Sequence, residues 1–235
     1  LTPHGARSGE VMLDGTALSQ ISLREQAAKI GFVMQNPDDQ IVTDKVWHEL
    51  AFGLENLGCE QSTMRLRVAE MASFFGIQGW FHREVAELSG GQKQLVNLAS
   101  VMAMQPEILI LDEPTSQLDP IAAADFLNTL KKINRELGTT VLITEHRTEE
   151  VFPAADRVIV MEDGRITADG SPKAVAGQLH QSGSRMFPAL PAPVRIFYGA
   201  GANGACPLTV REGRRWLAEQ FPGAPKITAL PPETG

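Results

Sequence analysis

A Ser-Gly-Gly-Gln run is the first feature of the sequence whose residue types could do chemistry. It follows Leu88 and precedes an expected helix from about residue 91 to 104. Adjacent glycines let backbone N–H groups approach an anion closely, and the helix dipole adds partial positive charge there. The same run is also typical of an ordinary loop before a helix, so it indicates a phosphate site only together with other motifs. The candidate cofactor-binding residues are Ser89, Gly90, Gly91 and Gln92.

Two adjacent carboxylates end an apolar run that follows this helix. The run 108–111 is expected as a buried strand, and Asp112-Glu113-Pro114 comes directly after it. Ligands of α/β sheets bind at the carboxyl ends of the strands. Asp112 is placed there to hold Mg²⁺ through water, and Glu113 to polarise an attacking water. The alternative is a plain strand-end turn, in which Asp and Pro are common.

Three further polar residues lie where they could join this site. His146 closes the apolar strand expected over 140–144, so it should project from the same sheet edge as Asp112 and face a phosphate. Gln35 follows a strand expected over 30–34 and can reach the same site. Asp119 stands before Pro120 and caps a helix, whatever else it does. A lone histidine in such a place is otherwise structural.

The elements that must position these residues alternate between short apolar strands and helices. This alternation predicts an α/β fold with a parallel sheet covered on both faces. The turn signals Asp14-Gly15 and Asp163-Gly164 close short strands, and Ser22 can cap a helix over 23–29. The expected strands are 9–15, 30–34, 108–111, 140–144, 157–161 and 165–168, and the expected helices are 23–29, 44–57, 63–75, 91–104, 121–137 and a short one from Arg147.

Two segments depart from the alternation. Residues 37–87 are helical throughout, which predicts a helical insertion or subdomain. From Pro188 onward lie eight of the fifteen prolines, a composition typical of a linker. Inside it, Thr209-Val-Arg-Glu212 is a capping-box pattern that opens one helix through about residue 220. The expected domains are 1–36 with 88–180 as a partial α/β core, 37–87 as the helical subdomain, and 181–235 as the linker.

These residues, in this order, resemble the ATP-binding-cassette (ABC) ATPases from residue 9 to about 175. The resemblance implies a P-loop NTPase-like core in which Asp112 and Gln35 serve Mg²⁺, Glu113 is the catalytic base and His146 contacts the γ-phosphate of ATP. It also implies that Ser89, Gly90 and Gly91 act in trans, on ATP held by a second cassette. The matching motifs are the signature (88–92), the Walker B strand (108–113), the D-loop (116–119), the Q-loop glutamine (Gln35) and the switch histidine (His146).

Three stretches narrow the resemblance to the ATPase subunits of energy-coupling-factor and cobalt-type importers. They are Gln35-Asn-Pro-Asp-Asp-Gln40, Ala51-Phe-Gly53 and residues 88–94. Such machines take up vitamins, vitamin precursors or metal ions. The resemblance implies a transmembrane coupling subunit, a substrate-binding membrane subunit and a peripheral place on the cytoplasmic face of the membrane. The segment 191–217 resembles the joint between two fused cassettes, so a second cassette is expected soon after Gly235.

One motif of the family is missing from the 235 residues. The Walker A loop, G-x-x-G-x-G-K-[ST], normally cradles the β- and γ-phosphates. It should fall just upstream of Leu1, so the core is expected to be incomplete at the N-terminus and the chain alone inactive. The glycine-rich 199–204 lacks Lys-Ser/Thr and is interpreted as a flexible turn. A truncated record and a degenerate, non-hydrolysing scaffold cassette are the two explanations.

Composition excludes some other classes of protein. The net charge of −7 argues against a nucleic-acid-coating protein. No apolar run reaches the roughly 18–20 residues of a membrane span. Cys59 and Cys206 lie far apart without a metal-binding pattern, which is typical of a reduced cytoplasmic protein. The chromosome and DNA-repair ATPases share the signature and Walker B motifs, but the insertion here is too short for their coiled coils.

Overall fold

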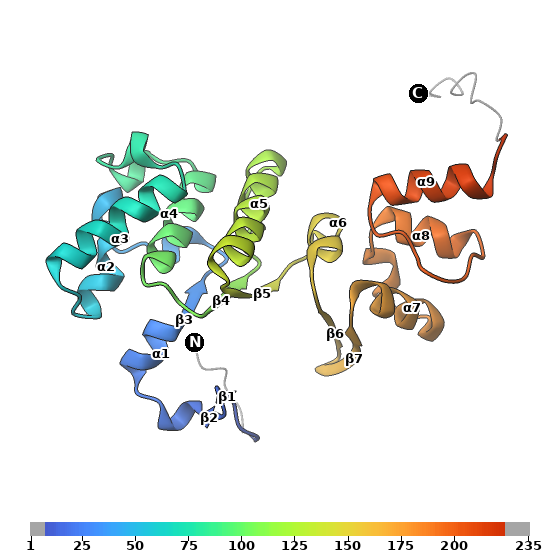
Figure 1. Ribbon diagram of the computed structural model, residues 1–235, viewed down its shortest axis with the longest axis horizontal. Coiled ribbons are helices and arrows are strands. Elements are labelled where there is room, and N and C mark those ends of the chain that lie inside the picture. Colours follow the sequence, from blue (N-terminus) through green and yellow to red (C-terminus); the bar gives the residue numbers. More distant parts are fainter. Residues whose placement is uncertain (1–7, 224–235) are drawn as a thin grey trace. The chain divides into compact units, whose positions relative to one another are not determined.

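The computed structural model describes residues 8–223, which form two compact units (Figure 1). Residues 8–146 belong to the first unit and residues 147–223 to the second. Each unit is built around its own sheet and helices, so each is described by itself. Residues 1–7 of the expected core and residues 224–235 of the expected linker lie outside the described residues.

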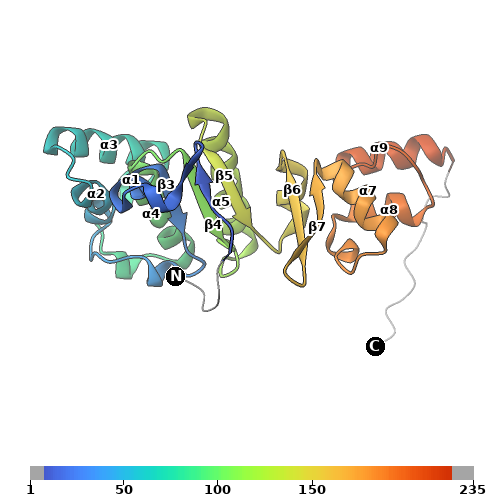
Figure 2. The same ribbon diagram turned by 90° about the horizontal axis from the view of Figure 1, so that it is seen from below.

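A three-stranded parallel sheet forms the centre of the first unit (Figure 2). Its strands are β3 (Ile30–Val33), β4 (Ile108–Asp112) and β5 (Thr140–Thr144), in the order β3-β4-β5. In register, Ile30 pairs with Ile108 and Ile108 with Thr140. Because all three strands run in the same direction, the residues that follow them meet at one edge, as the sequence predicted.

Helices cover one face of this sheet and leave apolar residues exposed on the other. On the covered face, Val33, Leu109 and Leu111 are fully buried, and helix α4 (Gly90–Ala103) packs against β3. On the opposite face, Phe32 and Leu142 are 42% and 55% exposed. A parallel sheet normally buries both faces. The described residues therefore supply one complete side of the expected core.

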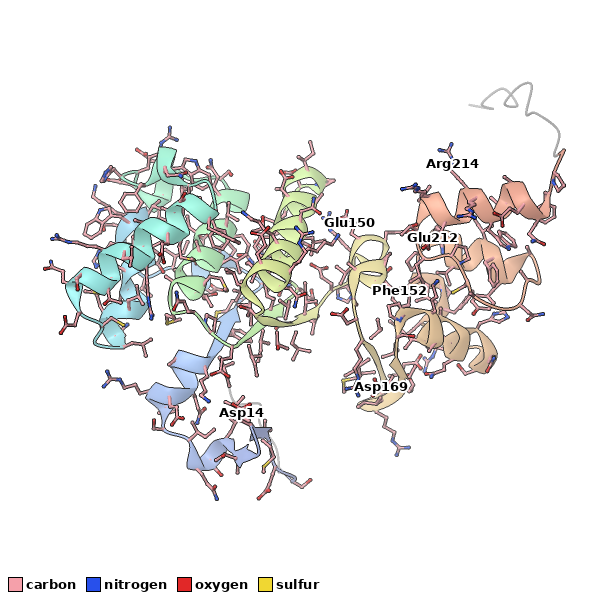
Figure 3. The ribbon with its side chains drawn as sticks, viewed as in Figure 1. Asp14, Glu150, Phe152, Asp169, Glu212 and Arg214 are labelled. Carbon is pink, nitrogen blue, oxygen red and sulfur yellow. The ribbon has the colours of Figure 1, made fainter. Side chains whose placement is uncertain are left out.

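The segment before this sheet is a hairpin followed by a capped helix. Strands β1 (Met12–Leu13) and β2 (Thr16–Ala17) pair antiparallel around Asp14 and Gly15, which both have left-handed backbone. The strand expected over 9–15 is thus two short strands joined by the predicted turn. Helix α1 (Leu23–Lys29) begins at Ser22, whose Oγ accepts the N–H of Glu25. Asp14, labelled in Figure 3, pairs with Lys29 at 3.2 Å.

Residues 37–87 are helical, as predicted, and pack against α4. Their long helices are α2 (Val46–Asn56) and α3 (Gln61–Phe74). Leu50, Leu54 and Leu98 are fully buried where α2 meets α4. The chain also contains short 3₁₀ helices at Leu18–Gln20, Pro37–Asp39, Gln78–Trp80, Val85–Glu87, Phe152–Ala154 and Phe187–Ala189.

Helix α5 (Pro120–Leu137) has both of the ends that the sequence predicted. Asp119 caps its first turn, and Gly138 ends it with a left-handed φ of 72°. Glycine adopts this conformation without a Cβ clash, which makes it the common residue after a helix. The chain then enters β5, which ends at the site.

The second unit contains a β-hairpin, four α-helices and two short 3₁₀ helices among residues 147–223. The hairpin pairs β6 (Val158–Glu162) with β7 (Arg165–Gly170). Arg157 donates two hydrogen bonds to Asp169, a residue labelled in Figure 3. The helices are α6 (Thr148–Val151), α7 (Pro172–Ser182), α8 (Ala192–Gly199) and α9 (Val210–Gln220). Their shared core contains Phe152, Val160, Ala168, Val175, Ala176, Leu179, Leu190, Val194, Phe197 and Cys206.

The expected single-helix linker after residue 180 needs correction. The capping box at Thr209 and Glu212 opens α9 as predicted, but α8 is a second helix that the sequence analysis missed. Pro191 and Pro193 were interpreted as linker residues, whereas proline also fits the first turn of a helix. Residues 190–206 pack with 152–179, and the two compact units divide at 146/147 rather than near 180. Residues 224–235 of the expected linker lie outside the described residues.

No helix within residues 8–223 is long and apolar enough to cross a membrane.

Candidate functional site

Three of the predicted site residues meet at the carboxyl edge of the sheet. Gln35 follows β3, Glu113 follows β4 and His146 follows β5. The amide Nε2 of Gln35 donates to Glu113 Oε2 at 3.1 Å. His146 Nε2 lies 2.9 Å from Glu113 Oε1. Each oxygen of one carboxylate is therefore engaged by a different neighbouring strand end.

Glu113 has an unusual backbone conformation for a residue with a side chain. Its φ is 42°, in the left-handed region, where a non-glycine residue is disfavoured by roughly 1–2 kcal/mol. Its N–H is held by the carbonyl oxygen and the hydroxyl of Thr144, each at 3.1 Å. These bonds to the neighbouring strand hold the turn that presents the carboxylate. Strained backbone of this kind recurs at functional sites, although Asp14, Gln105 and Asp163 adopt it elsewhere in the chain.

Asp112 is oriented by the same threonine. The hydroxyl of Thr144 donates to Asp112 Oδ1 at 2.8 Å while it accepts the N–H of Glu113. The sequence analysis missed Thr144 as a site residue, although its place at the end of an apolar strand beside His146 was a signal. Thr144 thus fixes both carboxylates of the pair.

Glu145 braces the turn that follows Glu113. Its carboxylate accepts the N–H of Thr115 at 3.1 Å and also the hydroxyl of Thr115. Its other oxygen accepts the N–H of His146 at 3.0 Å. The loops after β4 and β5 are therefore bonded to each other, which supports the meeting of Glu113 and His146.

The loop after Gln35 is closed by its own side chains. Gln40 Oε1 accepts the N–H of Met34, and Gln40 Nε2 donates to the carbonyl oxygen of Phe32, both at 2.9 Å. Asn36 caps the short 3₁₀ turn by accepting the N–H of Asp38. The two glutamines of the Gln35–Gln40 stretch thus have different roles: one faces the site and one ties the loop back to β3.

The Ser-Gly-Gly-Gln run begins α4 with a complete capping box. Ser89 Oγ accepts the N–H of Gln92 at 3.3 Å, and Gln92 Oε1 accepts the N–H of Ser89 at 3.0 Å. Gly90 and Gly91 form the first turn. A Cβ on Gly91 would lie 3.1 Å from the Cβ of Ala122, so a residue without a side chain permits the first turns of α4 and α5 to approach closely. Hydrogen bonds between this run and Gln35, Glu113 or His146 are absent from the described part of the chain.

Asp119 acts as the predicted helix cap. Its Oδ1 accepts the N–H groups of Ile121 and Ala122 at 2.9 and 3.0 Å. The structure therefore brings Gln35, Glu113 and His146 into contact, joins Asp112 to them through Thr144, and uses Asp119 and Ser89 at the starts of two neighbouring helices.

The residues of the site fit Mg²⁺ only in part. Mg²⁺ prefers oxygen ligands and is usually held by one or two carboxylates together with substrate phosphates. Asp112 is an exposed carboxylate held in place by Thr144. Within residues 8–223, no group of three or more His, Cys, Asp or Glu side chains is arranged to hold a metal ion. The protein ligand set present thus suits an ion that is also bound by a phosphate ligand.

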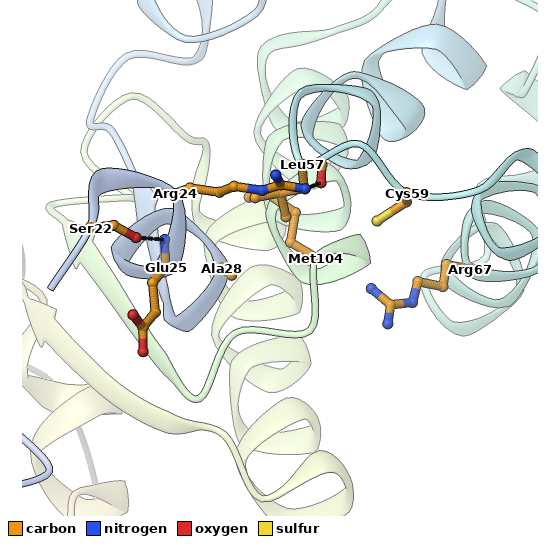
Figure 4. A pocket seen from close by; sticks show the side chains of 8 residues that line it. All are labelled: Ser22, Arg24, Glu25, Ala28, Leu57, Cys59, Arg67 and Met104. Carbon is orange, nitrogen blue, oxygen red and sulfur yellow. Dashed lines mark hydrogen bonds between the residues drawn. The ribbon is translucent and has the colours of Figure 1, made fainter.

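A separate cavity lies in the first unit, between α1, the α2–α3 loop and the end of α4 (Figure 4). Its volume is about 470 Å³. Arg24 donates to the carbonyl oxygen of Leu57, while the Cys59 thiol and the Arg67 guanidinium face the cavity. The remaining lining residues are Ser22, Glu25, Ala28 and Met104. Two arginines, one glutamate and several apolar side chains therefore share the wall of the cavity.

Comparison with known proteins agrees with this architecture. A model of the family described as ABC transporter matches residues 2–116. A protein of Bacillus thuringiensis subsp. konkukian (strain 97-27), provisionally named an ABC transporter ATP-binding protein, is 50% identical over 217 residues. That match covers 92% of this chain and 39% of the relative. A Methanosarcina mazei protein with the same provisional name is 40% identical over 168 residues, 72% of this chain and 51% of the relative.

A solved structure is also similar. CbiO1 from Clostridium perfringens, described as part of the ABC transporter complex cbiONQ, superposes with a TM-score of 0.66 and is 32% identical. The match covers 74% of this chain and 71% of that one. The chain therefore belongs to the ABC transporter ATP-binding family and has its P-loop NTPase-type α/β fold. It spans only about 39% of the Bacillus relative and 51% of the Methanosarcina relative.

Proposed function

We propose that this chain is part of an ATP-hydrolysing subunit that powers an ABC importer of the energy-coupling-factor type, for a vitamin, a vitamin precursor or a metal ion. The observation that carries the proposal is the contact of Gln35, Glu113 and His146 at the carboxyl edge of the sheet. A carboxylate flanked by an imidazole and an amide can accept a proton from water while its neighbours bind a phosphate.

Each residue of the cluster has a role in this proposal. Glu113 accepts the proton of the attacking water, and His146 contacts the terminal phosphate. Gln35 couples the binding of nucleotide at the site to the position of the loop that leads into the helical residues 37–87. Its bond to Glu113 and the closure of its loop by Gln40 support this role.

Asp112 and Gln35 are the residues that would hold Mg²⁺. The ion neutralises charge on the phosphates of ATP when it is bound. Asp112 offers a carboxylate oriented by Thr144. The cradle for the β- and γ-phosphates is not among these residues, because the 235-residue sequence has no G-x-x-G-x-G-K-[ST]. We therefore propose that ATP turnover requires such a loop in addition to this chain.

A second ABC cassette, fused or separate, is the proposed partner at the nucleotide. Ser89, Gly90, Gly91 and Gln92 would meet ATP held by that cassette, and Asp119 would lie near the shared surface. The capping box engages the N–H groups of Ser89 and Gln92, so the N–H groups of Gly90 and Gly91 are the ones left to meet an anion at the start of α4. In this arrangement closing of the pair brings each signature onto the other's nucleotide.

The proposed membrane partners are a transmembrane coupling subunit and a substrate-binding membrane subunit. We propose that residues 37–87 dock onto the coupling subunit at the cytoplasmic face of the membrane. The similarity to CbiO1, part of the cbiONQ complex, supports this type of importer. The transported substrate is not encoded in these residues, because the cargo is bound by other subunits.

The alternative is a degenerate cassette that contributes only its signature half as a scaffold. Such a cassette would lack G-x-x-G-x-G-K-[ST] in its full length, as the 235 residues do. Reading the coding sequence upstream of Leu1 separates the two: an in-frame G-x-x-G-x-G-K-[ST] supports the motor, and a start codon close to Leu1 supports the scaffold.

Where the motif is present, Glu113→Gln in the extended protein should abolish ATP hydrolysis and leave ATP-driven pairing of cassettes intact. Glu107→Gln is the matched control, because Glu107 precedes the amino end of the same strand and pairs with Lys29. Unchanged turnover in Glu113→Gln would contradict the assignment of Glu113.

A further inference from the structure

Gln94, a buried glutamine outside the predicted site, hydrogen-bonds to both of the loops that carry Gln35 and Glu113. Gln94 lies in the second turn of α4 and is fully buried. Its amide Nε2 donates to the carbonyl oxygen of Met34 and to that of Pro114, each at 3.1 Å. These carbonyls belong to the residue before Gln35 and the residue after Glu113. One NH₂ group thus joins the two backbone segments whose side chains meet at the site.

Thr144 and Gln94 hold the backbone on either side of Glu113 along the chain. Thr144 holds the N–H of Glu113, and Gln94 holds the carbonyl of the next residue, Pro114. Between these two anchors Glu113 keeps its left-handed φ of 42°. A backbone in this disfavoured region persists only where the surroundings hold it.

Two neighbours of Gln94 on the same helix hold the Gln35 loop as well. Asn97 Nδ2 donates to the carbonyl oxygen of Pro37 at 3.3 Å, and Lys93 pairs with Asp38 at 2.6 Å. Residues three and four apart lie on one face of a helix. This face of α4 therefore carries the loop that contains Gln35.

The side-chain carbonyl oxygens of Gln94 and Asn97 indicate a positioning role for Gln94. Gln94 Oε1 and Asn97 Oδ1 are buried and find no hydrogen-bond partner within the described structure. A buried acceptor without a partner lowers stability, so a glutamine is not the obvious residue for packing alone. Unlike an apolar side chain of similar length, Gln94 supplies two N–H donors.

We propose that Gln94 is a positioning residue that couples α4, the helix that begins with the signature run, to both Gln35 and Glu113. The functional role of Gln94 in this inference rests on the proposed function. The coupling of α4 to Gln35 and Glu113 is a property of the chain without nucleotide. A movement at the start of α4 is transmitted through Gln94 to the amide and the carboxylate together.

The test records the side-chain amide NMR signals of Gln35 in the 235-residue chain without nucleotide. Glu113→Ala supplies the reference position for a broken contact between Gln35 and Glu113. In Gln94→Met, which keeps the length but removes both donors, the Gln35 signals should shift toward that reference while the chain stays folded. Asn97→Leu is the matched comparison, because it removes an equally buried amide that holds the same loop only at Pro37 and reaches neither Met34 nor Pro114, and there the Gln35 signals should shift less than in Gln94→Met.

Unmoved Gln35 signals in folded Gln94→Met would overturn the proposal, and so would equal shifts in Gln94→Met and Asn97→Leu. Gln94→Asn replaces Gln94→Met if the latter does not fold, since its shorter side chain cannot reach both carbonyls at once. The same shift is expected, and its absence would overturn the proposal too. Because no ATP is involved, failure here leaves the proposed ATPase role standing, and failure of the upstream-sequence and Glu113→Gln tests leaves this measurement valid.

Discussion

Gln35 and Glu113, 78 residues apart in the chain, are joined by a 3.1 Å hydrogen bond from the amide of one to the carboxylate of the other. The bond links the loop after β3 to the turn after β4. The loop after β3 leads into the helical residues 37–87, which we propose to dock onto the membrane subunit. The turn after β4 presents Glu113, the proposed catalytic base. The hydrogen bond therefore connects the proposed docking region with the proposed catalytic residue.

Thr144→Val should destabilise the first unit by about 1 kcal/mol, because it removes a hydroxyl that serves both Asp112 and Glu113. Urea unfolding measures the change. Thr140→Val is the control at the start of the same strand, where the exposed side chain should change stability by no more than about 0.5 kcal/mol. Equal effects of the two substitutions would contradict the role given to Thr144.

Glu113→Gly should be more stable than Glu113→Ala by about 1 kcal/mol, because glycine adopts a φ of 42° without a Cβ clash. Both variants lose the same carboxylate and its contacts with Gln35 and His146, so the difference isolates the backbone. Parallel urea titrations give that difference. A more stable alanine variant would show that the left-handed conformation is not kept in solution.

Ser89→Ala should lower stability by about 1 kcal/mol through loss of the cap of α4. Ser89→Asp is the matched variant, because aspartate also accepts the N–H groups of a first helical turn and should retain most of the stability. Thermal or urea unfolding distinguishes them. If alanine and aspartate behave alike, the capping box contributes little.

The stability contributed by Glu212 should depend on pH. The backbone N–H of Leu208, followed by that of Thr209, holds the pKa of the Glu212 carboxyl below its ordinary value. A lowered folded-state pKa gives stability that is present above the unfolded pKa of about 4.3 and is lost as the pH falls through the folded value. The free-energy difference between the original chain and Glu212→Gln should therefore be largest near neutral pH and shrink below about pH 4. A difference that stays constant from pH 7 to pH 3 would contradict this.

Nucleotide titration of the 235-residue chain tests the need for a further phosphate-binding loop. We expect weak ATP binding and no turnover, because neither the backbone amides nor the lysine of such a loop is present. Isothermal calorimetry and a phosphate-release assay measure the two. Micromolar affinity would overturn this expectation.

The sequence by itself determined many of the local elements, although not the helices α7 and α8, and the edge at which the site lies. Caps at Ser22, Asp119 and Thr209 and the turn at Asp14-Gly15 were predicted correctly, because each depends on groups only a few residues apart. The gathering of Glu113 and His146 was also predictable, because parallel strands that end in polar residues must present them at one edge.

Only the tertiary structure decided which groups hold the site in place. Thr144, Gln40 and Gln94 form hydrogen bonds with backbone atoms that cannot be identified from the spacing of residues in the sequence. Gln94 reaches segments 60 and 20 residues away. The same holds for α8, whose prolines are compatible with either a linker or a helix until its apolar side chains find the core of the second unit. Local sequence sets what a segment can form, and burial against distant residues selects among the possibilities.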